Sequence, residues 1–156
     1  MKCLPYDPGI IPTKPSPIAG EKIMIKVSGY PPYKDEHFSM RNPRHPNYKA
    51  FVRLREAAIA AMNGRAWFFG PVAMNVALSA PSFEEGKTLL DYVSGIEDTL
   101  DGSSGCEFTY LPIVFEDDCQ VCDGRIRFIK TENIFYEVEI EFMSNQLNRT
   151  NTEPIC

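Results

Sequence analysis

The chain has 156 residues, 44% of them hydrophobic and 24% charged, with a net charge of −5 at pH 7. This length suits one domain that buries its core without disulfides. There is no run of about 18 apolar residues, so no membrane-spanning helix is expected. Five cysteines at irregular spacing favour a reducing cytoplasm and free thiols.

Basic and acidic residues are unevenly distributed. Residues 1–70 carry eleven Lys/Arg and five Asp/Glu, a net charge of +6. Residues 71–156 carry five Lys/Arg and sixteen Asp/Glu, a net charge of −11. A basic first half suits contact with phosphates, and an acidic second half suits metal binding. The alternative is that the two halves neutralise each other within one domain.

Composition divides the chain into three parts. Five prolines predict an extended arm or strap over residues 1–20, because proline lacks the backbone donor that a sheet needs. A folded domain is expected over residues 21–143. Residues 144–156 form a polar C-terminal tail.

Hydrophobic periodicity predicts a mixture of strands and helices in the central domain. The expected strands cover residues 22–29, 71–80, 108–115, 121–128 and 134–142. The expected helices run from residue 46 or 47 to a stop at Asn63-Gly64, and from about residue 87 to 100. This order predicts an α+β fold, a small mixed β-sheet with two main helices packed on it.

The most informative segment is residues 114–121, Val-Phe-Glu-Asp-Asp-Cys-Gln-Val, which places three neighbouring carboxylates in an apolar strand. Their mutual repulsion would be relieved by a divalent cation. We therefore interpret the segment as a candidate metal site. The alternative is a solvated strand end.

The second predicted helix supplies further carboxylates. Asp91 and Asp98 are seven residues apart, which places them two turns apart on one helix face. The small residues Ser94 and Gly95 leave that face open to a ligand or a closely packed chain. Together with Glu116-Asp117-Asp118, these oxygen ligands suit Mg²⁺ or Mn²⁺, ions that support phosphodiester hydrolysis.

Residues 88–102 and 113–121 resemble two segments of the RusA-like Holliday junction resolvases. That family shows a helix segment D-x-D-N-x-x-K-x-x-x-D-A-L-N-G and then a strand V-[YF]-x-D-D-x-Q-V. The glycine-proline pieces at 29–32 and 70–72 also resemble it, and the similarity covers roughly residues 22–142. The resemblance implies a small mixed α/β fold, usually a homodimer, that cuts branched DNA with magnesium and is often carried by phages.

Part of the family's catalytic pattern is retained. Asp118 matches the strand aspartate that is a catalytic metal ligand in the family, and Asp117 matches its neighbour. Asp98 matches the helix aspartate of the D-A-L segment. The resemblance therefore implies that Asp118 ligates the metal.

Other positions depart from that pattern. The D-x-D pair falls on Thr88 and Leu90, the asparagine after it on Asp91, and the catalytic lysine on Ser94. Leucine cannot ligate a metal, and serine cannot stabilise a transition-state charge as lysine does. Either Asp91, together with Glu84 or Glu85, replaces the lost carboxylates, or the nuclease is inactive.

We therefore expect a metal-dependent, structure-selective endodeoxyribonuclease acting on branched DNA in recombination or repair, as a cytoplasmic homodimer. The expected catalytic residues are Asp118, Asp117 and Asp91, and the expected ligands of Mg²⁺ or Mn²⁺ are Asp118, Asp91, Asp98 and Glu116. A basic loop would hold the DNA backbone through Lys34, Arg41, Arg44 and Lys49. No nucleotide-binding motif is present, so no nucleotide cofactor is expected. The alternative is a resolvase-like module that binds DNA structure or a protein partner without cutting.

Three further groups have competing interpretations. Trp67-Phe68-Phe69 suits the core or a dimer interface, with a wedge that enters a DNA junction as the alternative. Cys119-x-x-Cys122 lacks the second ligand pair of a structural zinc site, so free thiols are expected. Tyr30 and Tyr33 lie among the basic residues of the loop, a composition that suits base stacking and equally a solvated loop.

Overall fold

The structure is a computed structural model that describes residues 11–33, 42–101, 103–104, 109–110, 112–145 of the chain. Its elements are β1 (Lys22–Ser28), α1 (Tyr48–Met62), β2 (Val72–Ala80), α2 (Leu89–Leu100), β3 (Ser103–Ser104), β4 (Thr109–Tyr110), the 3₁₀ turn η2 (Asp118–Gln120), β5 (Val121–Lys130) and β6 (Phe135–Phe142). Both main helices and four of the five long strands predicted from the sequence are confirmed.

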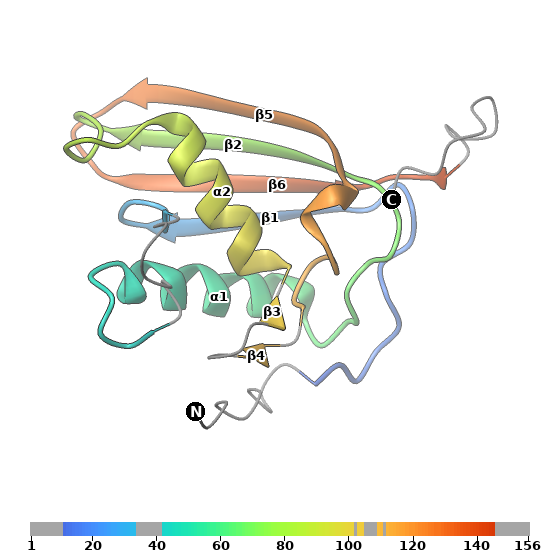
Figure 1. Cartoon of the computed structure of the whole chain (residues 1–156). Coiled ribbons are helices and arrows are strands. Elements are labelled where there is room, and N and C mark those ends of the chain that lie inside the picture. The colour runs from blue at the N-terminus through green and yellow to red at the C-terminus, as the bar shows by residue number, and fades with distance from the viewer. Residues whose placement is uncertain (1–10, 34–41, 102, 105–108, 111, 146–156) are drawn as a thin grey trace.

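Four strands form a mixed sheet in the order β1-β6-β2-β5, and both helices lie against one of its faces (Figure 1). β6 pairs antiparallel with β1 and with β2, whereas β5 pairs parallel with β2. The predicted α+β fold, a mixed sheet with two helices packed on it, is therefore confirmed.

Strand alternation decides which residues face the helices. On β1 the inward residues Ile23, Ile25 and Val27 are buried, and the residues between them are exposed. β6 alternates in the same way, so its glutamates line the face without helices. The core therefore lies between the sheet and the two helices.

The helices begin and end where their sequences dictate. α1 stops at Asn63, which has the left-handed backbone conformation (φ 50°), and Gly64 follows at φ 80°. α2 starts with a capping box. The Thr88 side chain accepts a hydrogen bond from the backbone amide of Asp91, and the Asp91 carboxylate accepts one from the backbone amide of Thr88. Its buried face includes Tyr92, Ile96 and Leu100.

Of the strand predicted over residues 108–115, the described residues form only the two-residue β4, and the prediction that the acidic triplet is set into a strand is wrong. Phe115 makes only an isolated bridge with Phe68, and the three acidic residues occupy a loop and η2 ahead of β5. The Asp117 carboxylate accepts from the amide of Cys119, 3.1 Å away. Such local side-chain bonds compete with a sheet ladder, which explains the error.

The described part of the proline-rich arm, residues 11–20, lies along the segment after α1. The amides of Thr13 and Lys14 donate to the carbonyl of Gly64, and Ser16 Oγ donates to the carbonyl of Trp67. This part is a strap on the domain. No helix in the described ranges is long and apolar enough to cross a membrane.

Candidate metal centre

Three aspartates meet where α2 ends. Asp98 in the last turn of α2, Asp101 at its C-cap and Asp118 in η2 each place a carboxylate oxygen so that all three oxygens lie within 4.8 Å of one another. Asp98 and Asp101 are half-buried, and Asp118 is exposed. These three residues are called the acidic group below.

Backbone hydrogen bonds bring the acidic loop, residues 112–118, to the end of α2. The amides of Ile113 and Val114 both donate to the carbonyl of Leu100, at 3.1 Å each. The side chains of Val114 and Phe115 are fully buried, so they anchor the loop in the core. The position of Asp118 relative to Asp101 therefore follows from packing as well as from local turn geometry.

Gln120 fixes the other side of this loop. Its Nε2 donates to the carbonyls of Phe68 and Gly70, both at 2.8 Å. Its Oε1 accepts from the amides of Glu116 (2.8 Å) and Asp117 (3.0 Å). The side chain is buried and all four interactions have good geometry, so it joins the acidic loop firmly to residues 68–70.

The electrostatics of the group disfavour further negative charge. Burial, followed by the negative charges of Asp118 and Asp98, raises the pKa of Glu97 to about 7. These carboxylates also gather at the C-terminal end of α2, where the helix dipole disfavours anions and no basic residue lies in the last turn. A bound cation would offset both effects.

The residues fit a divalent cation that prefers oxygen ligands. Mg²⁺ binds oxygens at roughly 2.0–2.1 Å in octahedral geometry, so its ligand oxygens lie about 3 to 4 Å apart. The oxygens of the acidic group need only small side-chain movements to reach that separation. Three carboxylates would leave the other coordination positions for water or a phosphate.

The structure separates the other sequence-predicted ligands from the acidic group. Asp91 caps the opposite end of α2, and its Oδ2 accepts from the Thr88 amide at 2.8 Å. The Cys119 amide that donates to Asp117 holds the pKa of that carboxyl below its usual range. The exposed Glu116 donates a hydrogen bond from its backbone amide to Gln120.

Asp101 and Glu97 are the residues of this site that were not predicted from the sequence.

No protein-family model matches this chain, and no curated protein is similar to it. The likeness to the RusA-like resolvases therefore rests on the sequence motifs at 88–102 and 113–121.

Two of the four predicted DNA-binding residues, Arg44 and Lys49, lie in the described part of the chain. Both are exposed, Arg44 ahead of α1 and Lys49 in its first turn, and the N-terminal end of α1 is on the opposite side of the view from the acidic loop (Figure 1). Lys34 and Arg41 lie outside the described residues.

Two tyrosines considered for base stacking are used in packing. The Tyr30 ring stacks on the buried Tyr92, with ring centroids 6.1 Å apart and planes 9° apart. The Lys87 ammonium lies 3.9 Å from the centroid of the half-buried Tyr33 ring. The backbone of Pro32 and Tyr33 covers the face of α2 at Gly95. The sequence left this face open to a ligand or to a closely packed chain, and the structure shows the closely packed chain.

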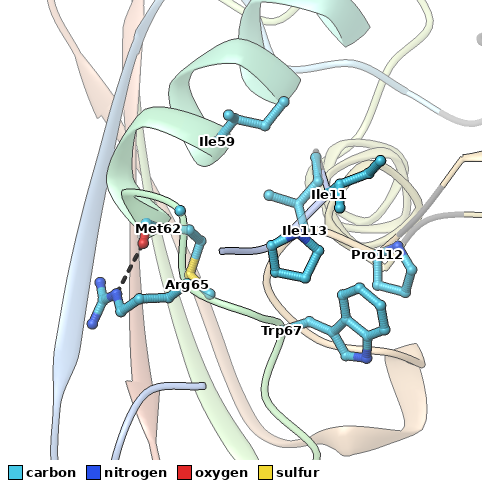
Figure 2. A pocket seen from close by; sticks show the side chains of 9 residues that line it. Ile11, Ile59, Met62, Arg65, Trp67, Pro112 and Ile113 are labelled. Carbon is cyan, nitrogen blue, oxygen red and sulfur yellow. Dashed lines mark hydrogen bonds between the residues drawn. The ribbon is translucent and has the colours of Figure 1, made fainter. Parts of the chain in front are cut away.

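The three aromatic residues 67–69 take different positions. Trp67 lines a small, mainly apolar pocket together with residues of the strap, the end of α1, and Pro112 and Ile113 (Figure 2). Phe68 packs on Phe142 with ring centroids 5.0 Å apart. Phe69 is 66% exposed. The described residues that line this pocket carry no carboxylate.

The prediction of free cysteines is wrong for Cys119, which is disulfide-bonded. Cys122 is a free, exposed thiol, as expected. An odd count and irregular spacing do not show which thiols approach each other in the fold, so sequence alone missed this bond.

Proposed function

We propose that this chain is a Mg²⁺- or Mn²⁺-dependent endodeoxyribonuclease that cuts branched DNA, such as Holliday junctions, in recombination or repair. The observation that carries the proposal is the acidic group, Asp98, Asp101 and Asp118. Asp98 and Asp118 fall on positions where the chain resembles the resolvases. Asp101, the third, supplies a carboxylate in place of those missing at Thr88 and Leu90.

Each residue of the proposed site has a defined task. Asp98, Asp101 and Asp118 would hold the cation, which when bound activates water and stabilises the leaving oxygen in phosphodiester hydrolysis. Glu97 has a pKa of about 7 without a cation, so it would release its proton when the cation binds beside it. Gln120 keeps the loop of Asp118 in place.

Cleavage of synthetic four-way junctions in Mg²⁺ or Mn²⁺ tests the proposal. We expect cutting by the wild type and a loss of roughly a hundredfold or more in Asp118→Asn and Asp101→Asn, because each removes a metal ligand. Asp91→Asn is the matched control at the other end of α2, and it should retain cleavage. Intact junctions after incubation with the wild type would contradict the proposal.

A second candidate function is binding of DNA structure without cutting, for which the substituted catalytic positions are the evidence. Leu90, where the resemblance would place a metal ligand, is 74% exposed, and Ser94, at the lysine position, adjoins the tightly packed Gly95. Junction binding that persists in EDTA, weakens with salt and leads to no cleavage would favour this candidate.

A further inference from the structure

Phe69 is held by the same side chain that holds the acidic loop. Gln120 donates to the carbonyls of Phe68 and Gly70, on either side of Phe69, and its other end accepts from the loop that carries Asp118. The amide of Phe68 also donates to the carbonyl of Val114 at 2.8 Å. The backbone at residue 69 therefore has a fixed position relative to the acidic group.

The neighbouring rings support Phe69 while leaving it exposed. The ring centroids of Trp67 and Phe69 are 6.2 Å apart, and Figure 2 shows Trp67 below Pro112 in the wall of the apolar pocket. A β-carbon at Gly70 would lie 2.8 Å from the inward-turned Phe68 ring, so glycine leaves room for that ring. Two aromatic rings are thus packed to the protein, and the third is presented to solvent.

An exposed phenylalanine on a fixed backbone is suited to stacking. Phe69 is the most exposed phenylalanine among the described residues, at 66% against 38% for Phe83 and 39% for Phe135. Stacking of a base on an aromatic side chain contributes about 1–3 kcal/mol and tolerates any base. Bases within an intact duplex are already stacked, whereas a branch point offers bases that are not.

We propose that Phe69 is the stacking contact for an unstacked nucleobase at the branch point of the DNA. The inference rests on the proposed function, since it assumes that a cation held by the acidic group contacts a phosphate of the same DNA. Gln120 sets the spacing between the two contacts. Phe69 would thereby contribute to the preference for branched over linear DNA.

Affinity for a four-way junction and for a linear duplex of the same sequence tests this inference. Binding is measured in EDTA, which prevents metal-dependent cleavage. Phe69→Ala should weaken junction binding roughly tenfold and change duplex binding less than about twofold, because only the junction has a base face that is not already stacked on another base. Phe69→Trp should keep junction binding within about threefold, since it retains a ring for stacking. Phe135→Ala, on the sheet face without helices, is the control and should change neither.

The outcomes separate this inference from the proposed function. If Phe69→Ala loses affinity equally for junction and duplex, or keeps its junction affinity unchanged, the stacking role of Phe69 is overturned. The proposed function still stands in that case, provided that the wild type cuts junctions. A loss in Phe69→Trp as large as in Phe69→Ala would also overturn the stacking role. A wild type that neither binds nor cuts branched DNA would overturn the proposed function and the stacking role together.

Discussion

Gly95 of α2 and Pro32 are in direct backbone contact. A β-carbon on Gly95 would overlap the carbonyl group of Pro32 and would lie 2.7 Å from Cα of Tyr33. Because the obstructing atoms belong to the backbone, no side-chain rotation relieves the clash. This contact holds the segment after β1 against the helix that carries two of the three residues of the acidic group.

We predict that Gly95→Ala destabilises the protein by about 2–3 kcal/mol, although alanine favours a helix by about 1 kcal/mol. The free energy of unfolding, from urea titration, provides the measurement. Ser94→Ala, one position earlier on α2, is the matched control and should change stability by less than about 0.5 kcal/mol. A Gly95→Ala variant as stable as the wild type would show that the segment does not pack as described.

Gln120→Ala should cost about 2–4 kcal/mol of stability, because it leaves two carbonyls and two amides without their partner. Asn47→Ala offers a comparison, since this buried amide side chain donates to Tyr33 rather than to the acidic loop. Both variants should lose stability, but only Gln120→Ala should also weaken Mn²⁺ binding. Equal Mn²⁺ affinity in the two variants would argue against the role of Gln120 in placing Asp118.

The raised pKa of Glu97, about 7, predicts a pH-dependent stability. The unfolded pKa is lower, so the folded state binds more protons and stability falls as the pH rises from about 4.5 to 7. Glu97→Gln should therefore stabilise the protein by about 1–2 kcal/mol at pH 8, after allowance for solvent screening, and by little at pH 4.5. Urea unfolding in EDTA at both pH values measures the difference. A gain that is equal at the two pH values would contradict the predicted linkage.

Mg²⁺ should raise the melting temperature of the protein through the acidic group, since a ligand that binds only the folded state stabilises it. Asp101→Asn should abolish this increase. Glu116→Gln should retain it, because Glu116 lies outside the acidic group although it neighbours Asp117. Thermal unfolding with and without Mg²⁺ distinguishes the two. If Glu116→Gln abolishes the increase and Asp101→Asn retains it, the cation binds at residues 116–118 and not at the acidic group.

Much of the fold follows from local sequence patterns. Period-two alternation identifies β1 and β6, and the Asn63-Gly64 stop marks the end of α1, because these signals depend only on neighbouring residues. The same kind of pattern wrongly predicts a strand for the apolar residues just before Glu116. Their burial comes from packing against distant parts of the chain and not from a strand in the main sheet.

The acidic group was only partly predictable. Asp98 and Asp118 follow from the resemblance, whereas Asp101 joins them because the Leu100 carbonyl holds the amides of Ile113 and Val114. That contact joins residues far apart in the sequence, and periodicity carries no information about it. Helical spacing pairs Asp91 with Asp98, but seven residues span roughly 10 Å along the axis, too far for one cation.

The proposed metal centre requires Asp98, Asp101 and Asp118 to hold one divalent cation. Anomalous diffraction from crystals soaked in Mn²⁺ would locate this ion. We expect a peak within about 2.3 Å of a carboxylate oxygen from each of the three residues. The result that rules out this metal centre is a map in which the three carboxylates are well ordered but no peak lies between them. The Mn²⁺ concentration in the soak should be at least the one used in the junction-cleavage assay.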